Sequence, residues 1–217
     1  MEKRGIEIYR KDAVKGISVT IGNTSVNTQG QPVKIRFEKQ MAYVYLVLDC
    51  SGSMAGEKLE QAKKGILDFA RDAFIKEYLV GLISFESAAR HICEPTSDIS
   101  LLKKGLEQVQ AIGSTNMASA ILMAYNQLKR FNSTRVIVVA TDGIPDNERD
   151  ALSAANIAKE EKLDIITIGT DGADQEFLKK LASKTHLANK VAKENFSQGI
   201  SSSVKFLPGP INIVKRQ

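Results

Sequence analysis

Residues 41–55 read MAYVYLVLDCSGSMA, and this stretch decides the fold. Its first part, MAYVYLVL, is an unbroken apolar run rich in β-branched and aromatic residues, as expected for a strand that is buried on both faces of a parallel sheet. The run ends in side chains that carry oxygen at alternate positions, Asp49, Ser51 and Ser53. A buried strand that ends in such a loop raises the question of what these oxygens bind.

Outward from this strand, the chain alternates apolar runs with amphipathic helical patterns. Residues 89–95 are mixed in polarity and contain Pro95, which predicts an edge strand. Buried strands are predicted at 77–85, 134–142 and 164–171, with a shorter one at 187–192. Helices are predicted at 55–74, 99–110, 113–131, 145–162, 174–183 and 195–207. This order predicts a doubly wound α/β domain with helices on both faces of a mostly parallel sheet.

The first 40 residues follow a different pattern. Apolar and polar residues alternate there with a period of two, which predicts strands at 6–10, 16–22 and 33–39. The segment NTSVNTQGQP separates the last two of these strands with turn signals. We therefore expect a small antiparallel β addition at 1–40, an α/β domain at 41–207 and a short tail at 208–217.

Composition and charge narrow the class of protein. The 217 residues are 43% hydrophobic and 25% charged, which is typical of a globular chain. The net charge of +5 is dispersed among acidic residues, as in EKLEQAKK, so we expect no nucleic-acid binding. No apolar stretch reaches the roughly 20 residues of a membrane helix, and the first residues lack the pattern of a signal peptide. We expect a cytoplasmic protein without membrane contact, in which Cys50 and Cys93 are free thiols.

Hydroxyl and carboxylate side chains also occur in two later loops. Thr115 precedes a predicted helix, and Asp142 ends a predicted strand. In an open α/β sheet, the loops beyond the carboxyl ends of the strands gather at one edge, where ligands bind. Oxygen ligands without His or Cys are typical of a site for a hard cation such as Mg²⁺. Because neutral hydroxyls leave much of the ion's charge uncompensated, such a site would accept a carboxylate from another protein.

These motifs carry a resemblance to a known family. The sequence DCSGS, with a later Thr in GSTN and a later Asp in ATDG, resembles the metal-ion-dependent adhesion site of the von Willebrand factor A domain. The resemblance covers residues 41–207 and implies one antiparallel edge strand in the sheet. It implies that both serines bind the metal directly, the threonine directly or through water, and the aspartates mainly through water. The implied ion is Mg²⁺, with Mn²⁺ or Ca²⁺ as substitutes, and the implied partner is a protein that supplies a Glu or Asp carboxylate. The implied metal ligands are Asp49, Ser51, Ser53, Thr115 and Asp142.

Two other classes of function stay open. One is an adaptor subunit of an ATP-driven remodelling complex, since intracellular relatives of this family often act beside such ATPases. The other is a Mg²⁺-dependent hydrolase, since two carboxylates and a metal could activate water. We expect no enzyme activity, because DCSGS departs from the G-x-S-x-G nucleophile elbow. In addition, no Lys, Arg or His is recognisable near the site in the sequence.

The remaining polar candidates have structural interpretations. His91 and His186 are expected on an edge strand and at the surface end of a helix, where neither suggests a catalytic base. Asp171 and Asp174 are interpreted as residues that cap a helix, in preference to a second cation site. No dinucleotide, P-loop or zinc motif is present, so nucleotide binding and a zinc site are disfavoured.

Overall fold

The structure, a computed structural model, describes residues 41–170 and 172–209 in full and the backbone of four further strands. The chain divides into two compact units, Met41–Gly209 and a unit formed by Met1–Gln40 together with Pro210–Gln217. In the second unit, neighbouring strands pair antiparallel, β1 with β2 and β3 with β10. Their bounds are Ile17–Ile21 for β1, Thr24–Thr28 for β2, Ile35–Lys39 for β3 and Asn212–Arg216 for β10.

The small antiparallel β addition predicted before the α/β domain is confirmed, and it differs from the prediction at residues 24–28 and in the tail. Residues 24–28, which the sequence suggests as part of a turn segment, form strand β2 and pair with β1 in register. The strand predicted at 6–10 lies outside the described residues. In the tail, Asn212–Arg216 forms β10, whose partner is β3 near the other end of the chain.

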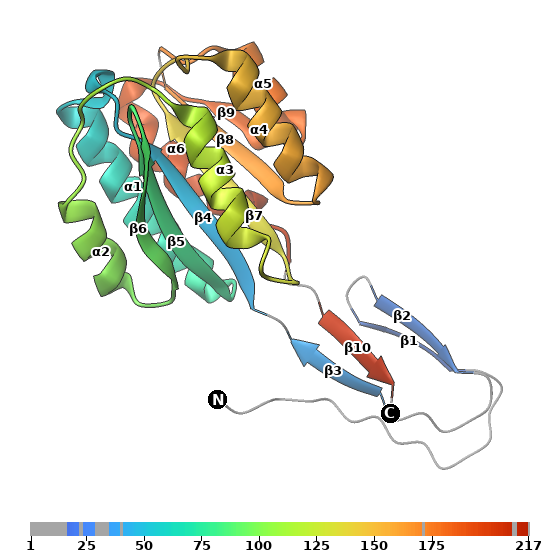
Figure 1. The fold of residues 1–217 in the computed structure, drawn as a ribbon. Helices are drawn as coiled ribbons and strands as arrows, with labels where there is room; N and C mark the ends of the chain where they lie inside the picture. Colours follow the sequence, from blue (N-terminus) through green and yellow to red (C-terminus); the bar gives the residue numbers. More distant parts are fainter. Residues whose placement is uncertain are drawn as a thin grey trace. The chain divides into compact units, whose positions relative to one another are not determined.

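The larger unit is built on a sheet of six strands in the order β6-β5-β4-β7-β8-β9 (Figure 1). All neighbours are parallel except β5 and β6, so the antiparallel edge strand is confirmed. Strand β4 pairs with β5 on one side and with β7 on the other. The strand order therefore reverses at β4, which is where ligands bind in open α/β sheets. The strands are β4 Ala42–Asp49, β5 Tyr78–Phe85, β6 Ala89–Thr96, β7 Arg135–Thr141, β8 Asp164–Gly169 and β9 Ala188–Lys190.

Helices cover both faces of this sheet, which confirms the predicted doubly wound arrangement (Figure 1). Helices α1, α2 and α6 pack on one face, and α3, α4 and α5 pack on the other. Their bounds are α1 Glu57–Ile75, α2 Ile99–Glu107, α3 Met117–Leu128, α4 Glu148–Glu160, α5 Gln175–Leu181 and α6 Phe196–Ser202. Short 3-10 turns are η1 Gly52–Met54, η2 Thr185–Leu187, η3 Lys193–Asn195 and η4 Ser203–Phe206. None of the helices in the described ranges is long and apolar enough to cross a membrane.

The unbroken apolar run of β4 is explained by burial on both faces. Val44, Leu46 and Leu48 belong to the core against α1, whereas Tyr45 and Val47 belong to the core against α3. Alternate residues of a strand point to opposite faces, so both sets must be apolar. This burial fixes the register of β4, and with it the position at which Asp49 leaves the sheet.

Two helix starts bear on the sequence interpretation. Asp174 caps α5, because its Oδ1 accepts a hydrogen bond from the Phe177 amide over 2.6 Å, as predicted. Asp171 lies outside the described residues. The sequence predicts that α4 opens at Pro145, but the helix begins at Glu148 behind the cap residue Asn147. The Asn147 side chain accepts a hydrogen bond from the Asp150 amide over 3.1 Å and so provides the helix cap. The loop before Asn147 is therefore not needed to cap α4.

Candidate metal centre

Asp49 is the last residue of β4, and the surrounding protein holds its carboxylate in place while burying it completely. Its Oδ1 accepts a hydrogen bond from the Ser51 amide over 2.9 Å, and its Oδ2 accepts one from the Thr141 hydroxyl over 2.5 Å. Burial raises the pKa of Asp49 above its ordinary value, and the hydrogen bonds from Thr141 and Ser51 oppose this shift. Asp49 is thus an oriented carboxylate whose charged form costs free energy.

The two serines and Asp142 form a continuous row of oxygen atoms. The hydroxyls of Ser51 and Ser53 lie 3.1 Å apart, and the Ser53 hydroxyl donates to Asp142 Oδ1 over 2.8 Å. The 3-10 turn Gly52–Met54 produces this geometry, because it folds the chain directly after Ser51. Asp142 is 2% exposed and follows directly after β7, the neighbour of β4 in the sheet. Two segments distant in sequence therefore meet at the point where the strand order reverses.

Thr115 belongs to the loop between α2 and α3, which backbone contacts tie to the DCSGS loop. The Ile112 amide donates to the Cys50 carbonyl over 2.8 Å, and the Gly52 amide donates to the Gly113 carbonyl over 3.1 Å. Within the described residues, no hydrogen bond joins the Thr115 hydroxyl to the other four predicted ligands. The structure thus links the side chains of Ser51, Ser53 and Asp142 directly. It attaches the Asp49 carboxylate through the Ser51 backbone amide and places Thr115 on an adjoining loop.

Three residues that the sequence analysis did not single out shape this site. Thr141 orients Asp49, as described above. Asp146, which falls within the predicted helix 145–162 but lies before α4, accepts from the Thr115 amide over 3.0 Å, while its own amide donates to the Thr115 carbonyl over 3.0 Å. The third is Lys58, whose ammonium donates to Asp142 Oδ2. The expectation that no basic residue lies near the site is therefore wrong, because α1 begins close enough for its second residue to reach Asp142.

The donor set fits a hard divalent cation. Within the described residues, no group of three or more His, Cys, Asp or Glu side chains could hold a metal ion. An ion at this place would therefore depend on hydroxyls as well as on Asp49 and Asp142, and hydroxyl and carboxylate oxygens suit Mg²⁺, Mn²⁺ or Ca²⁺. Contact between Ser53 and Asp142 at hydrogen-bond distance puts neutral and charged oxygens within reach of one ion.

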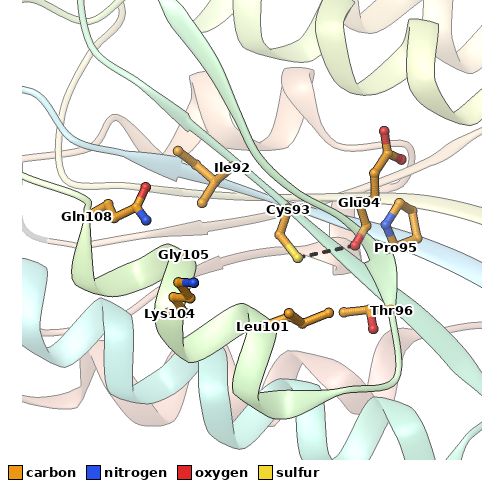
Figure 2. Close-up of a pocket in the computed structure, with 9 residues that line it drawn as sticks. All are labelled: Ile92, Cys93, Glu94, Pro95, Thr96, Leu101, Lys104, Gly105 and Gln108. Carbon is orange, nitrogen blue, oxygen red and sulfur yellow. Dashed lines mark hydrogen bonds between the residues drawn. The ribbon is translucent and has the colours of Figure 1, made fainter.

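A concavity lies between β6 and α2, apart from the predicted metal site (Figure 2). It has a volume of about 490 Å³ and shares none of its lining residues with the predicted ligands. The thiol of Cys93 donates to the Glu94 carbonyl over 3.3 Å, so this free cysteine has a local structural contact. On the opposite face of β6, His91 Nε2 lies 2.8 Å from the hydroxyl of the buried Tyr45, which supports the structural interpretation of that histidine.

Comparison with known proteins gives relatives of several kinds. The magnesium-chelatase 67 kDa subunit of Chlorobaculum parvum is 29% identical over 157 residues, which cover 69% of this chain and 25% of that protein. The inter-alpha-trypsin inhibitor heavy chain H4 of Sus scrofa is 30% identical over 113 residues, or 47% of this chain and 12% of that one. The chain thus spans a quarter or less of the length of these two relatives.

Solved structures share the fold at low sequence identity. The vWF domain of the pilus tip protein Mfa5 from Porphyromonas gingivalis has a TM-score of 0.70 at 14% identity, covering 77% of this chain and 95% of that one. The proximal thread matrix protein 1 from the mussel byssus, solved with a zinc-occupied MIDAS motif, also has a TM-score of 0.70, at 18% identity over 82% of this chain and 48% of that one. Residues 44–203 match the family described as the von Willebrand factor type A domain, and the chain belongs to that family.

Proposed function

We propose that this chain is a metal-dependent protein-interaction module. Its metal-ion-dependent adhesion site would consist of Asp49, Ser51, Ser53, Thr115 and Asp142, would bind Mg²⁺ with Mn²⁺ or Ca²⁺ as substitutes, and would accept a Glu or Asp side chain of a protein partner. The observation that carries the proposal is the row of oxygens from Ser51 through Ser53 to Asp142. The family, many of whose members mediate metal-dependent interactions, supports the same conclusion.

Each residue has a distinct part in this proposal. The hydroxyls of Ser51 and Ser53 would hold the ion directly without neutralising it. Asp49, fixed by Thr141 and by the Ser51 amide, would compensate part of the charge. A bound divalent ion would supply a localised positive charge that attracts a carboxylate. Asp146 would keep Thr115 in position through the two hydrogen bonds that it forms with the Thr115 backbone.

Exposed apolar side chains next to the site support a protein as the partner. Ile112 is 49% exposed in the loop that carries Thr115, and Ile144 is 53% exposed in the loop that carries Asp142. Interfaces commonly combine apolar contacts with a few polar groups that fix orientation. A protein segment with an acidic residue flanked by apolar side chains would use both features.

A second candidate role is that of a subunit in a larger complex, which stays compatible with the same site. The observation that favours it is the similarity to a chain named as a subunit of magnesium chelatase. Copurification under native conditions would separate this role from that of a module acting alone. An ATP-driven complex and a cytoplasmic location stay predictions in either case.

We also propose that the chain is not an enzyme. Among the described residues, Lys58 is the basic group that contacts the site, but its ammonium is engaged with Asp142. In addition, the DCSGS loop lacks the nucleophile elbow of hydrolases. A screen of phosphoesters and carboxylic esters at saturating Mg²⁺ should show no turnover above background. Turnover that disappears in Asp49→Ala would contradict this part of the proposal.

Two measurements test the proposed function. Calorimetric titration with Mg²⁺ should show binding to the wild-type chain and at least a tenfold loss of affinity in Asp49→Ala and Ser51→Ala, with circular dichroism unchanged. Capture of protein partners on the immobilised chain should require Mg²⁺, fail in chelator and fail with Ser51→Ala. Equal capture with and without chelator would leave the adhesion mechanism without support.

A further inference from the structure

The geometry points to Lys58 as the residue that sets the metal affinity of the site, and this inference rests on the proposed metal site. We propose that its ammonium competes with the divalent cation for Asp142. The Lys58 ammonium donates to Asp142 Oδ2, while Oδ1 of the same carboxylate accepts from Ser53. Both oxygens of Asp142 are thus already engaged, one by a neutral predicted ligand and one by a positive charge.

The location of Lys58 in its helix favours a specific role over a solvated surface charge. Lys58 is the second residue of α1, and positive charge in the first turn of a helix opposes the helix dipole. The other charged residues of that turn, Glu57 and Glu60, are acidic and follow the expected preference. The Lys58 side chain is 25% exposed and its partner is 1% exposed, so the pair is shielded from water more than a surface ion pair.

A count of charges shows why the two cations compete. Asp49 and Asp142 bring two negative charges to the site, and within the described residues Lys58 is the one side chain that forms an ion pair with either of them. A divalent ion balances two carboxylates without help. With Lys58 present as well, the site carries one positive charge in excess, and the two cations repel each other at short range. Binding of the metal must therefore weaken or break the contact between Lys58 and Asp142.

If the two cations compete for Asp142, loss of the Lys58 charge should change metal affinity and stability in chelator in opposite directions. Removal of the Lys58 charge should raise metal affinity, because the ion no longer competes for Asp142. The same change should lower stability in chelator, because the buried Asp142 loses its charged partner. A residue that only supports the fold would lower both quantities together, so the pair of signs separates the two explanations.

The experiment uses the full chain, with Mn²⁺ alone as the probe. Isothermal calorimetry should give Lys58→Met an affinity about tenfold above wild type, a change of about 1.4 kcal/mol. In chelator, the Tm of the same variant should fall by about 2 to 4 °C. Lys58→Arg keeps the charge and should stay within about threefold of wild type. The matched control is Lys64→Met, an exposed lysine of the same helix, which should change neither quantity.

The outcomes separate this inference from the proposed function. If the wild type binds Mn²⁺ and Lys58→Met binds it no more tightly, the role of Lys58 is refuted and the metal site stands. If neither chain binds Mn²⁺, the proposed metal site fails and the inference fails with it. Tighter binding together with a lower Tm in chelator supports the competition.

Discussion

Ser53 and Asp142 are joined by a hydrogen bond of 2.8 Å although 89 residues separate them in the chain. Strand β4 delivers the first residue and β7 the second, and these strands are neighbours at the reversal of strand order. The contact is therefore a direct consequence of the sheet topology. It also defines where an ion would bind, because it brings a neutral hydroxyl and a buried carboxylate to one point.

Substitution of the buried aspartate should separate stability from metal binding. Burial raises the pKa of Asp49, so its ionised form destabilises the folded chain once the pH exceeds the ordinary carboxyl range. Asp49→Asn removes the charge and keeps an oxygen for the Ser51 amide. In chelator at pH 8, we expect the variant to unfold at an equal or higher urea concentration than wild type, with the difference shrinking as the pH falls and wild-type Asp49 is protonated.

The same variant should gain no stability from added Mg²⁺, whereas wild type should become more stable with it. Urea unfolding followed by circular dichroism measures both effects. A variant clearly less stable than wild type in chelator at pH 8 would show that the Asp49 charge contributes to folding and would contradict this prediction.

Asp146 is expected to influence metal binding without touching the ion. Its two hydrogen bonds with the Thr115 backbone fix the loop that carries a predicted ligand. Asp146→Ala removes the hydrogen bond that its carboxylate accepts from the Thr115 amide and keeps the one that its backbone amide donates. The variant should weaken Mg²⁺ binding by about three- to tenfold, or about 1 kcal/mol, because the loop is held less firmly. Calorimetry measures this change. Asp150→Ala removes the carboxylate that accepts a hydrogen bond from the side-chain amide of the cap residue Asn147, and it serves as the control for effects of helix stability. Equal losses in the two variants would argue against a positioning role.

Gly113 allows the Thr115 loop to approach the loop after β5. Its φ is +73°, and a Cβ atom there would lie 2.5 Å from the Ser87 hydroxyl. Gly113→Ala should lower the free energy of unfolding by about 1 to 2 kcal/mol, because the alanine is strained and displaces its neighbours. Gly143→Ala, where no atom lies within 4 Å, is the matched control and should change stability little. Chemical denaturation of both variants checks this, and an unaffected Gly113→Ala would contradict it.

Cys50 should be chemically inert in the folded chain. Burial and the nearby Asp49 charge raise the pKa of its thiol to about 12. Because the thiolate is the reactive form, Cys50 should react with a thiol reagent at pH 8 on the order of 1,000 times more slowly than an unperturbed cysteine. The measurement uses Cys93→Ser, so that Cys50 is the remaining thiol, and compares native with urea-unfolded protein. Rapid native reaction would show that the loop opens readily.

The main features of the fold could be predicted because local patterns and topology agree. The apolar run of β4 alternates between two cores, and that double burial is visible in the sequence as an unbroken hydrophobic stretch. The parallel order then places the ends of β4 and β7 side by side, which is why Asp49 and Asp142 could be grouped from sequence patterns alone. Antiparallel β2 escaped prediction because its residues, TSVNT, are mostly polar and resemble a turn.

The finer parts of the site depend on positions that sequence patterns define poorly. Asp146 and Asn147 are both good residues for starting a helix, and only the tertiary contact with Thr115 assigns them different roles. Lys58 reaches Asp142 because α1 begins directly after Gly56, whose φ is +79°. An error of one turn in that boundary would direct the lysine elsewhere, and helix boundaries are the least predictable feature of a sequence.

The most direct test of the central claim is a crystal structure with Mn²⁺, located by its anomalous scattering. We predict one anomalous peak bound directly by the hydroxyls of Ser51 and Ser53 at roughly 2.1 Å, with Asp49, Thr115 and Asp142 arranged around the same ion. An ordered DCSGS loop with no anomalous peak near these serines, at Mn²⁺ concentrations that saturate other adhesion sites, would contradict the account.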